Sequence, residues 1–126
     1  MGHEPVTIDE LRAFCLSLPG THEKETWGDA EHAGDITFRV KDRIYVMTGP
    51  EGKGGASIRT SLEQQAELLD TFPGIFRSSA YVGRFGWVSV GLDAVDDDLL
   101  RGIVEGAWRR TAPKSVVKAY DAESGA

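Results

Sequence analysis

The residues that could bind a ligand are arginines and aromatic residues interleaved along the middle of the chain. Arg39, Arg59 and Arg84 supply guanidinium groups, and Tyr45 and Trp87 supply flat rings. Guanidinium groups bind phosphate oxygens, while aromatic rings stack on nucleic-acid bases. These five residues therefore predict a nucleic-acid-binding surface, which requires that the strands carrying them share one exposed sheet face.

Alternation along the expected strands assigns the two faces of the sheet. Successive side chains point to opposite faces, so the apolar member of each alternating pair indicates the core side. The core side takes Ile36, Phe38, Val40, Ile44, Val46, Ile58, Val88, Val90 and Leu92. The opposite side takes Thr37, Arg39, Tyr45, Met47, Ser57, Arg59, Trp87 and Ser89. Arg84 projects from a turn that Gly83 and Gly86 bracket.

No residue pattern in the chain is typical of catalysis or of a metal site. His22 and His32 lie among acids, but their spacing matches no defined metal site. Cys15 falls on an apolar helical stripe and is predicted to be a buried small hydrophobe. The segment 49–55, with Lys53, lacks the phosphate-loop pattern and predicts a hairpin turn. We therefore expect a protein that is not an enzyme and uses no metal or cofactor.

The charge of the chain is unevenly distributed. The net charge of −6 argues against strong nonspecific binding to nucleic acid. Positions 39–59 nevertheless hold five bases against two acids, and positions 71–92 hold two bases and no acid. One cysteine suits a reducing compartment. No apolar run reaches the ~20 residues of a membrane span, and the first residues lack a signal-peptide pattern. We expect one cytoplasmic domain over 1–126 and no membrane partner.

Three helices and several short strands must position the candidate residues. A Thr7–Glu10 capping box begins the first helix, and Asp96–Asp98 opens the third. The second is capped either by Ser61 with Gln64 or by Thr60 with Glu63. The expected strands cover 24–27, 36–41, 43–48, 56–60 and 87–92. This order predicts an α+β fold with an antiparallel sheet and helices packed on one face. The ordered core should span about 7–113, with a loosely ordered C-terminal tail.

Several stretches in a fixed order resemble the MmcQ/YjbR family of small bacterial proteins. They are residues 16–21, 23–25, 38–40, 43–45, 72–76, 81–83, 86–88 and the helix within 92–108. Together they extend over residues 8–112. The resemblance implies a CyaY-like (frataxin-like) α+β fold in a double-wing arrangement. It also implies DNA binding, and it supplies no agreed catalytic residues.

The residues leave three functions open. The first is a noncatalytic nucleic-acid-binding or regulatory module that uses the uncovered sheet face. The second is a protein-interaction or homodimerisation module in which Trp87, Tyr45 and Met47 form the contact patch. The third is a small-molecule-binding protein with a pocket between the Gly83–Gly86 turn and the sheet. A structural role for Trp87, under a loop or in a cross-strand pair, is the alternative to all three.

Overall fold

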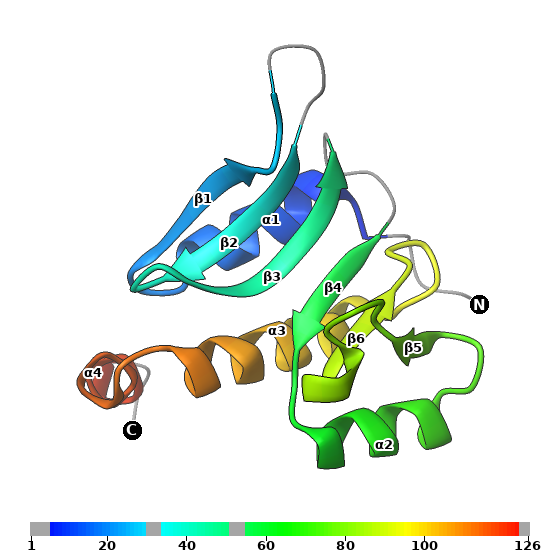
Figure 1. Cartoon of the computed structure of the whole chain (residues 1–126). Helices are drawn as coiled ribbons and strands as arrows, with labels where there is room; N and C mark the ends of the chain where they lie inside the picture. The colour runs from blue at the N-terminus through cyan, green and yellow to red at the C-terminus, as the bar shows by residue number, and fades with distance from the viewer. Residues whose placement is uncertain (1–5, 30–33, 51–54, 124–126) are drawn as a thin grey trace.

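A six-stranded antiparallel sheet and four helices make up the part of the chain that the computed structural model describes, residues 6–29, 34–50 and 55–123 (Figure 1). The strands are β1 (Thr21–Thr26), β2 (Asp35–Val40), β3 (Arg43–Pro50), β4 (Ala56–Arg59), β5 (Phe76–Ser78) and β6 (Trp87–Val90). The helices are α1 (Ile8–Ser17), α2 (Leu62–Thr71), α3 (Asp97–Thr111) and α4 (Lys114–Glu123), with a 3-10 turn η1 at Gly83–Phe85. The spatial order of the strands is β1-β2-β3-β4-β6-β5. The predicted α+β class with an antiparallel sheet is confirmed.

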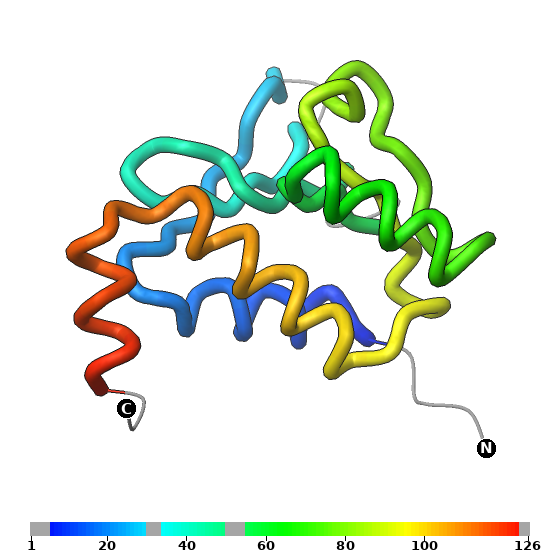
Figure 2. Tube along the Cα trace, turned by 90° about the horizontal axis from the view of Figure 1, so that it is seen from below, coloured from blue at the N-terminus to red at the C-terminus, as the bar shows by residue number. Residues whose placement is uncertain are grey.

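Two helices form a layer on one face of the sheet. Figure 2 shows α1 and α3 side by side beneath the strands, while α2 lies near β5 and β6. The core lies between the sheet and this layer, where the sheet residues Phe38, Ile58 and Val88 and the helical residues Leu11 and Trp108 are at most 2% exposed. Burial of these apolar side chains is the main term that holds the two layers together.

The junction of β3 with β4, which we call the seam, lies in the middle of the sheet. β1, β2 and β3 form long ladders, whereas among the described residues β3 pairs with β4 at three positions, from Val46↔Ile58 to Thr48↔Ala56, as many as join β5 to β6. β4, β6 and β5 make the second half. Helix α3 contacts both β3 and β4 and so crosses the seam.

Local capping starts the helices where the sequence predicts. The Thr7 hydroxyl accepts from the Glu10 N–H at 3.1 Å, and the Glu10 carboxylate accepts from the Thr7 N–H at 3.1 Å. Ser61, and not Thr60, caps α2 through a 3.0 Å bond from the Gln64 N–H. Each cap satisfies N–H groups that have no partner inside the helix.

A β-bulge changes the face of one predicted site residue. Arg39 pairs with Ile44 and Phe38 pairs with Val46, so Tyr45 is the extra residue on β3. The extra residue turns Tyr45 to the helix side, where the side chain is 0% exposed. Ile44 consequently lies opposite Arg39 and outside the core cluster. The prediction that Tyr45 lies on the uncovered face and Ile44 in the core is wrong, because the alternation stops at the bulge.

The predicted loosely ordered tail is also wrong over most of its length, because Lys114–Glu123 forms α4. The Tyr120 ring packs edge-on against Trp108, with 5.0 Å between ring centroids. Asp121 receives two hydrogen bonds from Arg109, at 2.6 and 3.0 Å. Pro113 indicates the end of the preceding helix, but proline is equally suited to the beginning of the next one. The helical signal was the spacing of Val116, Val117 and Tyr120, which pack against the core.

Candidate anion-binding groove and aromatic turn

Arg39 lies along the face of β1 and β2 that α1 and α3 leave uncovered. Its Nε donates to the Thr37 hydroxyl at 3.1 Å, and its Nη2 donates to the Thr26 hydroxyl at 2.9 Å. The Thr37 hydroxyl in turn donates to the Lys24 carbonyl at 2.8 Å and is fully buried beneath the guanidinium group. Arg39 thus takes the predicted face, and two hydroxyls fix the orientation of its side chain.

Trp87 is buried, and its predicted exposure on an open sheet face is wrong. The side chain is 9% exposed and lies outside the main core cluster. The Ser79 N–H donates to the Trp87 carbonyl at 3.1 Å and so continues the pairing of β5 with β6 beyond Ser78. Gln65 of α2 donates to the same carbonyl at 2.8 Å. Alternation placed Trp87 opposite the core but could not show that other segments close around it.

Tyr45 forms part of the contact between the sheet and α1. Its hydroxyl lies 2.7 Å from the Thr21 hydroxyl and donates to the Cys15 carbonyl at 3.3 Å. Burial raises the pKa of Tyr45 and raises the pKa of the Cys15 thiol to about 12. Both groups are therefore neutral at pH 7. The burial predicted for Cys15 is confirmed, and Tyr45 offers no ring for stacking.

Four cationic side chains line a groove between the β2–β3 turn and the junction of α3 with α4. Lys41 and Arg43 come from the turn, and Arg110 and Lys114 come from the junction. All four are exposed, and the groove has a volume of about 530 Å³. None of the four forms an ion pair with a carboxylate of the described residues, and Asp42 between the first two contacts His22 at 3.7 Å. We call this site the basic groove.

The geometry of the β2–β3 turn holds the first two cations at the groove. Lys41 and Asp42 have φ of 52° and 62°, which places both in the left-handed region typical of a two-residue hairpin turn. The turn therefore projects Lys41 and Arg43 toward the end of α3. The sequence shows the basic bias of this turn, but Arg110 and Lys114 follow about 70 positions later, so the pattern gave no reason to combine them.

The first turn of α4 adds partial positive charge to the basic groove. The residue before the helix is Pro113, which has no side-chain acceptor, and its carbonyl accepts from the N–H groups of Val116 and Val117 at 3.0 and 3.1 Å. Unpaired N–H groups and the helix dipole both favour an anion at a helix N-terminus. Pro113 and Lys114 themselves line the groove.

Arg59 connects the basic groove to a second exposed surface. Its Nη1 donates to the Thr111 hydroxyl at 3.4 Å, and Thr111 lines the groove. The next residue, Thr60, donates its N–H and its hydroxyl to the Gly86 carbonyl. The end of β4 therefore connects the groove with the segment 79–86.

The segment 79–86, which we call the aromatic turn, carries two exposed rings. Tyr81 is 95% exposed with φ of 65°, and Phe85 is 61% exposed. The guanidinium carbon of Arg84 lies 4.7 Å from the centre of the Phe85 ring. Gly86 has φ of 101°, and a Cβ there would lie 2.4 Å from the Thr60 carbonyl oxygen. The prediction of a structural turn with an exposed Arg84 is confirmed, whereas the exposed rings were not recognised as site residues.

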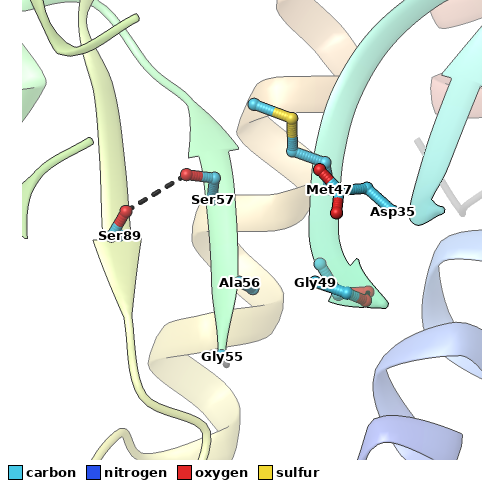
Figure 3. Close-up of a pocket in the computed structure, with 8 residues that line it drawn as sticks. Asp35, Met47, Gly49, Gly55, Ala56, Ser57 and Ser89 are labelled. Carbon is cyan, nitrogen blue, oxygen red and sulfur yellow. Dashed lines mark hydrogen bonds between the residues drawn. The ribbon is translucent and has the colours of Figure 1, made fainter. Parts of the chain in front are cut away.

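A small polar pocket lies on the seam between β3 and β4 (Figure 3). Its volume is about 160 Å³, and it is lined by Asp35, Met47, Thr48, Gly49, Gly55, Ala56, Ser57 and Ser89. The hydroxyls of Ser57, Ser79 and Ser89 lie 2.7 to 3.1 Å from one another in a closed ring. Each hydroxyl can donate to one neighbour and accept from the other. The three hydroxyls are thus bonded to one another, and the Asp35 carboxylate lines the same pocket.

No three histidine, cysteine or acidic side chains gather into a metal site within the described ranges, and His32 lies outside them. The predicted hairpin turn at 49–55, with Lys53, falls largely outside the described residues as well. Among the helices that the structure describes, none is long and apolar enough to cross a membrane.

The described residues form a small α+β protein with a groove that four cationic side chains line. Residues 16–110 match the YjbR family model, and the chain belongs to the YjbR family. It is similar to the crystal structure of Deinococcus radiodurans protein DR2400, which contains the domain DUF419. The TM-score is 0.70 and the identity 27%, over 81% of this chain and 75% of that chain. No curated protein matches the chain.

Proposed function

We propose that the protein is a noncatalytic nucleic-acid-binding module and that the basic groove holds the phosphate backbone. The observation that supports this function is the set of four cations, Lys41, Arg43, Arg110 and Lys114, gathered without a described carboxylate partner. A protein with a net charge of −6 has many acids with which to neutralise a purely structural basic cluster. Unneutralised cations around a groove match a ligand that brings its own negative charges.

The acidic remainder of the molecule restricts where nucleic acid binds. A phosphate backbone is repelled by a negative surface and attracted by a local positive one, and both effects extend over roughly 10 Å at moderate salt. Binding should therefore be confined to the basic groove and its immediate surroundings. We expect weak affinity with a steep salt dependence, because each neutralised phosphate releases a counterion.

The five residues predicted from the sequence contribute unequally to this proposal. Arg59 lies beside the groove through its bond to Thr111, and Arg84 lies on the aromatic turn. Arg39 lies on the open face of β1 and β2, with two of its nitrogens bonded to hydroxyls. Tyr45 and Trp87 are buried and stack on nothing outside the protein. Their burial also removes the patch predicted for a protein partner.

Two arginines on α3 provide a matched test of the proposal. Arg110 lines the groove, whereas Arg101 on the same helix is bonded to Asp97 at 3.0 Å, away from the groove. Arg110→Ala should weaken binding to a labelled duplex and reduce the log–log salt slope by about 0.9. Arg101→Ala should leave the slope unchanged. Anisotropy titrations of the wild type and both variants at two salt concentrations measure this difference.

Two results would contradict the proposal. The first is the absence of binding tighter than ~10⁻⁴ M at low salt, since ordinary nonspecific binders do better than that. The second is an equal loss of binding in Arg110→Ala and Arg101→Ala. Such a result would show that binding depends on the total charge of the protein and not on the basic groove.

A further inference from the structure

We infer that the nucleic acid is single-stranded and that its bases stack on Tyr81 and Phe85 of the aromatic turn. This inference rests on the proposed function and adds the strandedness of the ligand. The rings are 95% and 61% exposed, and they are held on a short turn and not on a long loop. Two exposed rings on one short turn offer flat surface on which bases can stack.

The backbone of the aromatic turn is fixed before any ligand binds. Gly83 donates to the Ser79 carbonyl at 2.8 Å, and Gly86 donates to the Gly83 carbonyl at 3.0 Å. Gln65 of α2 donates to the Gly83 carbonyl at 2.8 Å. The positive φ of Tyr81 is a strained conformation that the surrounding bonds maintain. A rigid turn loses little entropy when a base stacks on its rings, which favours binding.

The aromatic turn continues the surface of the basic groove. Arg59 is bonded to Thr111 at the groove, and Thr60 is bonded to Gly86 at the turn, so two consecutive residues join the sites. Residues 71–92 include Arg77 and Arg84 and no acid, so phosphates next to stacked bases meet no carboxylate from this segment.

The exposed rings discriminate between single strands and duplexes. In a duplex the flat face of each base is covered by its neighbours, and only base edges and phosphates reach the surface. A ring on the protein then has no base face to contact. In a single strand the bases are free to unstack and lie on aromatic side chains, whatever their sequence. The groove binds both forms through phosphates, whereas the aromatic turn adds affinity only for the single strand.

Titrations with a 20-nucleotide oligo(dT) and with a 20-base-pair duplex test the inference. Tyr81→Ala and Phe85→Ala should each weaken oligo(dT) binding by about fivefold or more, the effect of losing one stacked base. Neither variant should change duplex binding. Tyr81→Phe, which keeps the ring, should bind as the wild type does. Trp27→Ala is the matched control, because Trp27 is 69% exposed at the far end of β1.

The outcomes separate this inference from the proposed function. If both ligands bind and the Tyr81 and Phe85 variants match the wild type, the inference fails and the groove proposal stands. If neither ligand binds, both fail. If the wild type is a dimer in sedimentation and Tyr81→Ala or Phe85→Ala makes it a monomer, the aromatic turn is a contact between copies, and the inference is overturned. Circular dichroism should show that each variant retains the fold.

Discussion

The three tryptophans of this chain differ in their surroundings and not in their chemistry. Trp108 is fully buried, with its indole N–H bonded to the Pro19 carbonyl at 2.9 Å. Trp87 is 9% exposed, and Trp27 is 69% exposed. Removing a buried tryptophan costs about 3–5 kcal/mol of the free energy of unfolding. Trp108→Ala should lower the free energy of unfolding by an amount near the top of that range, and Trp87→Ala should lower it by about 3 kcal/mol. Trp27→Ala should leave it nearly unchanged. Urea denaturation measures all three, and a small effect for Trp87→Ala would contradict the burial described here.

The Tyr45 hydroxyl forms hydrogen bonds to both β1 and α1. Tyr45→Phe keeps the ring but removes the bonds to the Thr21 hydroxyl and the Cys15 carbonyl. A buried hydrogen bond of this kind contributes about 1 kcal/mol to stability. We expect the free energy of unfolding to fall by about that amount in urea denaturation at pH 7. A variant as stable as the wild type would show that water replaces the lost partners.

Burial of Cys15 and Tyr45 makes the fold sensitive to alkali. Burial raises both pKa values, that of Cys15 from 9.0 to about 12, so the folded state holds these protons more tightly than the unfolded chain. The stabilisation is complete below the unfolded pKa values and is lost as the pH rises toward the folded ones. The free energy of unfolding should therefore decline above about pH 9. The decline should be shallower in the double variant Cys15→Ala/Tyr45→Phe, and an unchanged slope would contradict this explanation.

At the scale of elements, the sequence predicts those features that depend on interactions between neighbouring residues. The caps at Thr7 and at Ser61, the second being one of two that the sequence allows, depend on a few neighbouring residues, and both form. The turn falls at Lys41–Asp42, so β2 ends at Val40, one residue earlier than the predicted strand end at Lys41. The bulge at Tyr45 depends on how two strands align, and the burial of Trp87 depends on a segment that returns from elsewhere in the chain. Helix α4 was missed because its apolar side chains gain their stability from α3 and the core. The basic groove required two parts of the chain that only the fold brings together.

Two glycines test how backbone geometry positions the aromatic turn. Gly86 has a φ that side chains rarely adopt, and a Cβ there would meet the Thr60 carbonyl oxygen. Gly86→Ala should therefore reduce stability by more than about 1 kcal/mol. Gly102 lies within α3 and has open space around the position of a Cβ. Gly102→Ala should stabilise the protein by about 0.5–1 kcal/mol, since alanine favours the helix. Thermal denaturation of the pair gives the comparison, and equal shifts would contradict the described turn.

At the scale of the whole molecule, an acidic protein keeps one basic surface free of internal ion pairs. Some acids elsewhere pair with arginines of the helices: Arg12 of α1 binds Glu23 of β1 at 2.8 Å, and Arg109 of α3 binds Asp121 of α4 at 2.6 Å. The groove cations have no such partner among the described residues. In the proposed function, this charge asymmetry would orient an approaching polyanion before contact. The family model and the fold identify the scaffold, and the groove is the feature of this chain that indicates a ligand.

The pairing of β3 with β4 at the seam joins two units of the fold. One unit consists of β1, β2, β3 and α1, and the other of β4, β5, β6 and α2. Helix α3 contacts both β3 and β4 and so packs across the three residue pairs that join the units. Amide hydrogens at the seam should exchange through partial opening of the fold and not through complete unfolding. Their exchange should therefore be faster than that of the amides of Phe38 and Val88. A nucleic acid bound to the groove and the aromatic turn would contact both units at once. The bound nucleic acid would hold the two units together. It should therefore slow amide hydrogen exchange at the seam, at residues that it does not contact.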